Sequence, residues 1–257
     1  MRRDDLQQTF DLTDRVAIVT GGSRGIGLAV AQGFAAMGAK VVIASRKADA
    51  CAEAVRSIEA EGGTALAVPT HVGDLDGLAA LVDITVAELG GIDIVFNNAA
   101  NPLALPIGSI TPEAWEKSFD ANLRGPVFLV QHALPHLKES PHAAVVNILT
   151  AGIYTSGRYL SMYVAAKTAM LAYTRSMAAE LAPFGIRVNA IAPGAVATQM
   201  LLSMDDASQQ AAVSAQLIRR MAAPDEMVPG AVFLASDASS FMTGQTLVLD
   251  GGMTTGS

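Results

Sequence analysis

The sequence contains a single cysteine, Cys51, so no disulfide can form within the chain. A reducing compartment is therefore expected, and four scattered histidines with one cysteine offer no metal-ligand spacing. Aromatic residues make up only 5% of the chain and charged residues only 16%. Because hydrophobic residues nevertheless reach 51%, we expect a sizeable core built mainly from Ala, Val, Leu, Ile and Met.

Basic residues are outnumbered by acidic ones, and the formal net charge is -7. This balance argues against nucleic acid or an anionic membrane surface as the main partner. No run of about 18 apolar residues is present that would cross a bilayer. The opening stretch, MRRDDLQQTF, lacks the apolar centre of a secretory signal. We therefore expect a cytoplasmic protein that has no membrane partner.

Short β-like runs alternate with helical patterns along nearly the whole chain. The first apolar run, residues 15–20, stops at two glycines, and apolar residues at helical spacing follow it. This alternation predicts an α/β fold with parallel strands and helices on both faces of the sheet. Residues 1–257 are predicted to form a single domain with a short N-terminal extension at 1–11. Further strands are predicted at 40–44, 64–68, 92–96, 143–149, 186–191 and 247–249.

A glycine-rich turn, TGGSRGIG at 20–27, joins the first predicted strand to the first predicted helix. Glycine lets the backbone turn tightly and approach a ligand closely. The helix N-terminus adds free N–H groups and the positive end of a dipole, which suit a pyrophosphate. The spacing G-x-x-x-G-x-G differs from the general dinucleotide fingerprint G-x-G-x-x-G. A glycine-rich turn without any ligand is the alternative interpretation.

Tyr163 and Lys167 lie four residues apart in a stretch with helical periodicity, so their side chains should share one face. A free phenol has a pKa of about 10, and a nearby cation lowers that pKa. Such a shift would make Tyr163 a general acid/base nearer neutral pH. The same spacing also occurs in ordinary solvated pairs on helices, so its meaning depends on the rest of the chain.

Several further motifs occur in order along the chain, and with the glycine-rich turn and the Tyr163–Lys167 pair they closely resemble the short-chain dehydrogenase/reductase family. The resemblance extends from about residue 12 to residue 252. It implies a single-domain, doubly wound, Rossmann-like fold with a seven-stranded parallel sheet of strand order 3-2-1-4-5-6-7. It also implies hydride transfer between a nicotinamide and a carbonyl or alcohol carbon. These further motifs are Asn97-Asn98-Ala99, Asn122 in ANLRG, Ile186-Arg187-Val188-Asn189, Pro193-Gly194 and Asp250-Gly251-Gly252.

The resemblance implies catalytic roles for three of these side chains. Tyr163 would protonate the carbonyl oxygen of the substrate, or deprotonate the alcohol in the reverse direction. Lys167 would lower the pKa of Tyr163 and hold the hydroxyls of the nicotinamide ribose. Asn122 would bind a water molecule that connects Lys167 to solvent and relays protons.

The fourth catalytic position departs from the family, because Thr150 stands where a serine is usual. Its hydroxyl can still donate a hydrogen bond to the substrate oxygen, while its methyl group restricts χ1 and takes up room in the pocket. We therefore expect activity to be retained, at a reduced rate or over a narrower substrate range. Ser156 and Ser161 are rival hydroxyls with poorer spacing. Thr150 could alternatively make only a structural hydrogen bond.

The choice of nicotinamide is predicted from the end of the second strand, 40–44. Ser45 and Arg46 follow it without an acidic residue that would accept bonds from the ribose of NAD. Arginine matches the phosphate of NADP, and Arg24 could reach the same group, so we predict NADP(H) rather than NAD(H). Solvated loop charges are the alternative. The residues expected to contact the cofactor are Gly21, Ser23, Arg24, Gly25, Ile26, Gly27, Ser45, Arg46, Val72, Asn98, Ala99, Tyr163, Lys167, Pro193, Gly194, Val196 and Thr198.

The substrate pocket implied by the resemblance lies between residues 154–162, residues 101–105 and the segment 195–221. We expect segment 195–221 to be a mobile lid made of two helices with an apolar inner face. An apolar pocket suits a medium-sized ketone or alcohol or a 3-oxoacyl thioester, whereas the net charge disfavours an acidic carrier protein. The alternative is that these apolar residues simply pack on the core. They are Met200, Leu201, Leu202 and Met204.

Two other functions stay open at this point. A reductase of carbon–carbon double bonds would look alike in the cofactor half, although the presence of Tyr163 and Asn122 disfavours it. A catalytically silent NADP(H)-binding relative is favoured only by Thr150. The resemblance also implies a homotetramer built on the long helices at about 111–137 and 162–181 and on the C-terminal strand region.

Overall fold

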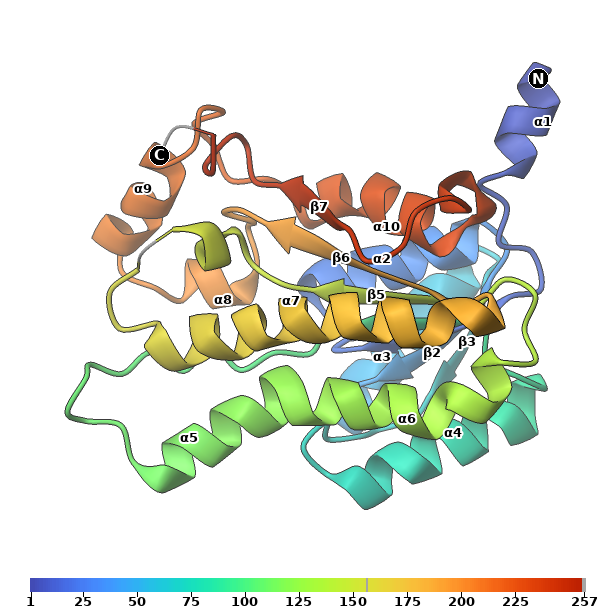
Figure 1. Ribbon diagram of the computed structural model, residues 1–257, viewed down its shortest axis with the longest axis horizontal. Coiled ribbons are helices and arrows are strands. Elements are labelled where there is room, and N and C mark those ends of the chain that lie inside the picture. Colours follow the sequence, from blue (N-terminus) through green and yellow to red (C-terminus); the bar gives the residue numbers. More distant parts are fainter. Residues whose placement is uncertain (156, 256–257) are drawn as a thin grey trace.

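The computed structural model describes residues 1–155 and 157–255 of the chain. Within these residues, seven strands form one parallel sheet in the order β3-β2-β1-β4-β5-β6-β7, with helices on both faces (Figure 1). The predicted fold class and strand order are therefore confirmed. The strands are β1 (Val16–Thr20), β2 (Lys40–Ala44), β3 (Thr64–Ala67), β4 (Ile94–Asn97), β5 (Ala144–Ile148), β6 (Arg187–Pro193) and β7 (Thr246–Leu249).

Every predicted strand is present, and the differences from the prediction lie at the strand ends. Strand β4 begins at Ile94, two residues after the predicted start at 92, and β6 continues to Pro193 instead of stopping at 191. The extension of β6 arises because Pro193 pairs with Leu249 of the edge strand β7. Strand ends depend on such pairing with neighbours, which the periodicity of a single segment does not contain.

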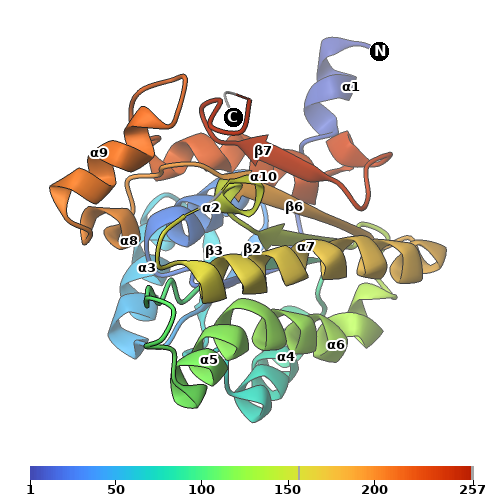
Figure 2. The same ribbon diagram turned by 60° about the vertical axis from the view of Figure 1, so that its left-hand side comes forward.

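Two apolar clusters hold the layers together, one on each face of the sheet. Helices α4, α6 and α7 cover one face, and α2, α3 and α10 cover the other (Figures 1 and 2). None of the helices in the described residues has the length and apolar character needed to cross a membrane. The helices are α1 (Arg3–Gln8), α2 (Gly25–Ala36), α3 (Ala48–Ala60), α4 (Leu75–Leu89), α5 (Pro112–Phe119), α6 (Gly125–Leu137), α7 (Ser161–Leu181), α8 (Gln199–Leu202), α9 (Asp206–Ser214) and α10 (Val228–Ala235).

The long helix predicted at 111–137 is interrupted by a π-helical turn, Asp120–Arg124, which separates α5 from α6. Just after this turn, a Cβ atom on Gly125 would lie 2.0 Å from the backbone oxygen of Val72. Only glycine allows this close approach, so α6 starts directly against the loop that follows β3. The π-helical turn itself carries Asn122, whose side chain is fully buried. Such turns are frequent at functional sites.

The segment 195–221 follows β6 and contains α8 and α9, which lie at the carboxyl end of the sheet (Figure 1). The apolar inner face expected of this segment stays a prediction. Leu201 is buried, whereas Met200 and Leu202 are 37% and 54% exposed. Helix α8 is only about one turn long, so its side chains differ in how far they are buried.

Candidate active site

The glycine-rich turn is locked to the end of β4 by Thr20 and Asn98. Thr20 Oγ1 accepts hydrogen bonds from the backbone N–H groups of Asn98 (3.0 Å) and Ala99 (3.1 Å). Asn98 Nδ2 donates to the backbone oxygens of Thr20 (2.9 Å) and Gly21 (3.3 Å). Thr20 was not among the predicted site residues, although a hydroxyl at the strand end directly before two glycines is a signal for such a lock.

The same turn leads into the N-terminus of α2, where the cofactor phosphates are expected to bind. Gly25 has a φ of +54°, and a Cβ on Gly27 would lie 2.3 Å from the backbone oxygen of Gly21, so both positions require glycine. The N-cap residue Arg24 makes no side-chain cap for α2. The first N–H groups of the helix therefore lack a side-chain cap, an arrangement that fits a pyrophosphate.

The ends of β1 and β2 meet through two serines. Ser23 Oγ donates to Ser45 Oγ at 2.9 Å, which brings the glycine-rich turn against the predicted phosphate-binding residues. Arg46 is exposed beside this contact. Arg24 Nη1 donates to Oε1 of Gln199, the first residue of α8. Gln199 was not predicted as a site residue, and no local sequence pattern marks it.

Tyr163 and Lys167 share one face of α7, as predicted, and both are buried. Lys167 Nζ lies 5.9 Å from the centroid of the Tyr163 ring and donates to the backbone oxygen of Ile148 at 2.7 Å. Burial raises the pKa of Tyr163 to about 12 and lowers the pKa of Lys167 to about 8. Burial therefore opposes the lowering of the Tyr163 pKa that is expected from the neighbouring cation.

Thr150 follows β5 and caps a 3₁₀ turn at Ala151–Tyr154. Its Oγ1 accepts a hydrogen bond from the backbone N–H of Gly152 at 3.2 Å, so the structural role considered for this threonine is present. That bond uses the oxygen as an acceptor, and the hydroxyl proton can still be donated to another group. Of the rival hydroxyls, Ser161 is the exposed first residue of α7, and Ser156 lies outside the described residues.

Asn122 uses its side-chain amide to hold the loop that follows β4. Its Oδ1 accepts from the backbone N–H of Asn101 at 3.0 Å, and its Nδ2 donates to the backbone oxygens of Asn101 and Ser118, both at 2.8 Å. This loop is tied in turn to the segment before α7, because the N–H of Leu105 donates to the backbone oxygen of Tyr159 at 2.9 Å. Two of the segments predicted to line the substrate pocket are thus joined.

A buried polar chain links β4, β5 and α7. Asn97 Nδ2 donates to Asn147 Oδ1, and Asn147 Nδ2 donates to Thr174 Oγ1, both at 2.9 Å. Thr174 Oγ1 then donates to the backbone oxygen of Met170 at 2.8 Å. This chain fixes α7, and with it the Tyr163 ring, relative to the strand ends. In the sequence, the features that could have indicated this chain are a threonine in the middle of a helix, Thr174, an asparagine directly after one predicted strand, Asn97, and an asparagine inside another, Asn147.

The end of β6 is held by Gln216, another residue that the sequence did not mark. Gln216 is 4% exposed; its Oε1 accepts from the N–H of Ala195 and its Nε2 donates to the backbone oxygen of Arg220, both at 2.7 Å. A Cβ on Gly194 would lie 2.7 Å from both Gln216 Oε1 and the Cα of Asp250. The position therefore requires glycine, and the base of segment 195–221 is fixed.

The other predicted cofactor residues after β6 lie at the same edge of the sheet. Pro193 ends β6, and Val196 forms an isolated parallel bridge with Ala222. Thr198 approaches the glycine-rich turn, because a Cβ on Gly25 would lie 3.2 Å from its Cγ2. The start of segment 195–221 therefore contacts the proposed dinucleotide-binding turn directly.

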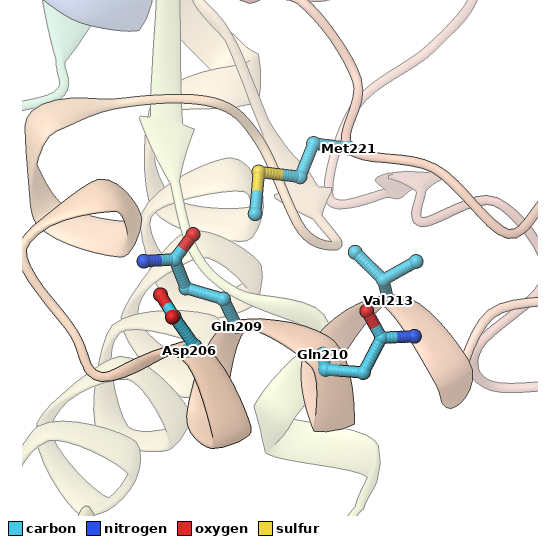
Figure 3. Close-up of a pocket in the computed structure, with 5 residues that line it drawn as sticks. All are labelled: Asp206, Gln209, Gln210, Val213 and Met221. Carbon is cyan, nitrogen blue, oxygen red and sulfur yellow. The ribbon is translucent and has the colours of Figure 1, made fainter.

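Two cavities border segment 195–221. One, of about 230 Å³, lies between α9 and Met221, whose side chain points toward α9 (Figure 3). The other, of about 460 Å³, lies between residues 216–222 and β7. Neither is lined by Thr150 or by the Tyr163–Lys167 pair, and no group of three or more potential metal ligands occurs among residues 1–155 and 157–255. The smaller cavity is lined by Asp206, Gln209, Gln210, Val213 and Met221.

A parallel sheet of this order, with a glycine-rich turn after its first strand, is typical of proteins that bind a dinucleotide at the carboxyl ends of the strands. A family model described as Enoyl-(Acyl carrier protein) reductase matches residues 21–254. The chain belongs to the short-chain dehydrogenase/reductase family. It is therefore an oxidoreductase that uses a nicotinamide cofactor.

Individual relatives agree with this assignment. Dehydrogenase/reductase SDR family member 4 of Homo sapiens is 35% identical over 94% of this chain and 88% of its own length. Cis-4-hydroxycyclohexanecarboxylate dehydrogenase of Sinomonas cyclohexanicum is 38% identical over 94% of this chain and 97% of its own length.

Solved structures are similar over nearly the whole chain. A short-chain type dehydrogenase/reductase from Mycobacterium marinum has a TM-score of 0.92 and 32% identity, covering 97% of this chain and 99% of that one. A protein from Beutenbergia cavernae whose structure contains NADP at low occupancy has a TM-score of 0.90 and 34% identity, covering 97% of this chain and 100% of that one.

Proposed function

We infer that this oxidoreductase uses NADP(H) and interconverts a carbonyl and an alcohol on a small apolar molecule or a 3-oxoacyl thioester, with Tyr163 as general acid/base. The observation that carries this inference is the buried Tyr163–Lys167 pair, held at the carboxyl end of β5 by the 2.7 Å bond from Lys167 to Ile148. Thr150 follows the same strand end, so its hydroxyl and the phenol would be directed at one substrate oxygen.

The residues at the carboxyl edge of the sheet fit a nicotinamide dinucleotide. The uncapped N-terminus of α2 and the glycines of the turn would hold its pyrophosphate. Ser45, Arg46 and Arg24 would hold the 2′-phosphate of NADP. Asn98 and Ala99 would contact the half of the cofactor that carries the nicotinamide and its ribose. When bound, the cofactor supplies or accepts the hydride. That one related structure contains NADP supports the choice of this nucleotide.

Proton transfer belongs to the protein's own side chains. With a pKa near 12, Tyr163 is protonated at neutral pH and is ready to donate its proton to a carbonyl oxygen. Lys167, with a pKa of about 8, remains mainly cationic at neutral pH and would stabilise the phenolate that forms. Thr150 would donate a hydrogen bond to the same substrate oxygen and polarise the carbonyl.

The proposal also covers the oligomeric state, the role of segment 195–221 and the location of the protein. The stacked rings of Trp115 and Phe119 on α5, with centroids 4.2 Å apart, and the 44% exposed Tyr173 on α7 support a homotetramer formed through these helices. Segment 195–221 would close over the substrate as a lid. The buried free thiol of Cys51 fits the reducing conditions of the cytoplasm.

The test is NADPH oxidation with a panel of diketones and acetoacetyl thioesters, followed by the Tyr163→Phe variant. Removal of the phenolic proton should lower turnover by roughly 10²-fold or more while NADPH binding, followed by cofactor fluorescence, is unchanged. Binding without any turnover by the unaltered protein would instead identify a silent relative. Turnover of enoyl substrates alone would identify a reductase of carbon–carbon double bonds.

A further inference from the structure

A hydrogen bond joins two parts of the molecule that are 175 residues apart in sequence. Arg24 Nη1, in the glycine-rich turn, donates to Oε1 of Gln199, the first residue of α8. The next residue of the turn, Gly25, lies close to the methyl group of Thr198. The start of segment 195–221 therefore rests on the turn that would hold the cofactor phosphates.

Packing of the segment on the rest of the molecule is sparse between its two ends. Its far end is anchored by Gln216, while α9 contributes no buried residue and α8 contributes only Leu201. Segments with few buried contacts open with small free-energy cost. The position of α8 therefore depends strongly on polar contacts such as the one between Arg24 and Gln199.

The chemistry of the pair leaves Arg24 able to bind a second group. A guanidinium has five N–H donors in a rigid fork, and the bond to Gln199 uses one of its terminal nitrogens. The remaining N–H groups can donate two hydrogen bonds to a phosphate in bidentate geometry. An amide oxygen orients the guanidinium without neutralising its charge, whereas a carboxylate at position 199 would compete electrostatically with the phosphate.

We propose that Gln199 is a positioning residue for cofactor choice: it orients Arg24 toward the 2′-phosphate, so that NADP(H) binding and closure of segment 195–221 favour one another. This inference rests on the proposed NADP(H) site. By thermodynamic reciprocity, a closed segment that improves phosphate binding is itself stabilised by the phosphate to the same extent. NAD(H), which lacks that phosphate, gains nothing from the contact.

The first test replaces the acceptor oxygen with a side chain of similar length, Gln199→Met. Dissociation constants for NADPH and NADH are measured by cofactor fluorescence without substrate. Loss of one hydrogen bond that orients a charged group should weaken NADPH roughly three- to tenfold and leave NADH nearly unchanged. The matched control is Gln8→Met, an exposed glutamine on α1 whose side chain contacts Asp11, which should change neither constant. Equal weakening of both cofactors by Gln199→Met would overturn the inference.

A double-mutant cycle then tests whether Gln199 acts through Arg24. Once Arg24→Ala has removed the guanidinium, adding Gln199→Met should cause no further loss of NADPH affinity. Additive losses would show an independent role and refute the inference alone. If Arg24→Ala leaves the NADPH/NADH ratio unchanged, the phosphate assignment in the proposed function fails together with the inference.

Protease protection supplies a readout that is independent of affinity. At saturating nucleotide, NADP⁺ should slow cleavage within segment 195–221 more than NAD⁺ does, and Gln199→Met should abolish that difference. Equal protection by the two nucleotides in the unaltered protein would rule out the coupling.

Discussion

The Lys167 ammonium nitrogen lies 5.9 Å from the centre of the Tyr163 ring, and both side chains are removed from solvent by the same packing of α7 against the strand ends. Their pKa values move toward the uncharged forms as a result, up for the phenol and down for the amine. The phenol is therefore stored in its acid form, which suits the reduction of a carbonyl at neutral pH.

The pH dependence of carbonyl reduction should reflect this arrangement. Lys167 has a pKa of about 8, so its cation is present below that pH and is lost as the pH rises through it. Since the cation stabilises the phenolate left after proton donation, kcat/KM for reduction should fall above about pH 8. The measurement is kcat/KM as a function of pH at saturating NADPH. The fall above about pH 8 should be absent from the Lys167→Met variant. A rate that stays level up to pH 9.5, roughly one and a half units past that pKa, would contradict the assignment.

Thr150→Val and Thr150→Ser should have opposite consequences. Valine removes the hydrogen bond from the N–H of Gly152, so we expect a loss of about 1 kcal/mol in the free energy of unfolding. It also removes the hydroxyl proposed to donate to the substrate, so kcat should fall by roughly 10- to 100-fold. Serine keeps the hydroxyl and removes the methyl group, so activity should be kept or raised. Urea unfolding and steady-state kinetics of the two variants provide the measurements. Equal activity of the valine variant and the unaltered protein would assign Thr150 a structural role only.

Arg46→Asp should reverse the nicotinamide preference. An aspartate beside Ser45 would repel the 2′-phosphate of NADP and accept bonds from the ribose hydroxyls of NAD. We expect NADPH to bind about tenfold more weakly and NADH to bind more tightly. Titration of both reduced cofactors, with Arg56→Asp at an exposed position of α3 serving as a charge-matched control outside the proposed site, measures the effect. An unchanged preference would refute the phosphate role of Arg46.

Gly125→Ala should destabilise the fold where α6 meets the loop after β3. The added methyl group would stand 2.0 Å from the backbone oxygen of Val72, so the backbone must shift at an expected cost of about 1–3 kcal/mol. Gly91→Ala is the matched control, because open space surrounds its Cβ position. Thermal unfolding compares the two variants, and similar melting temperatures would contradict the close approach.

Much of the fold follows from local patterns in the chain. Helix α4 occupies residues 75–89, because Asp74 caps its first turn and Gly90 takes the left-handed conformation that ends it. The Tyr163–Lys167 pair is likewise a local feature, since a helical spacing of four places both side chains on one face. These features depend on interactions between near neighbours, which a single segment of sequence contains.

The sequence by itself therefore determined the order of strands and helices, the glycine-rich turn and the paired phenol and amine. The tertiary structure alone decided the contact between Arg24 and Gln199, the anchoring of Ala195 by Gln216 and the split exposure of α8. It also decided the direction of the Tyr163 pKa shift. Each of these depends on which distant segments exclude water or supply a partner, and that information arises only when the strand ends are brought together.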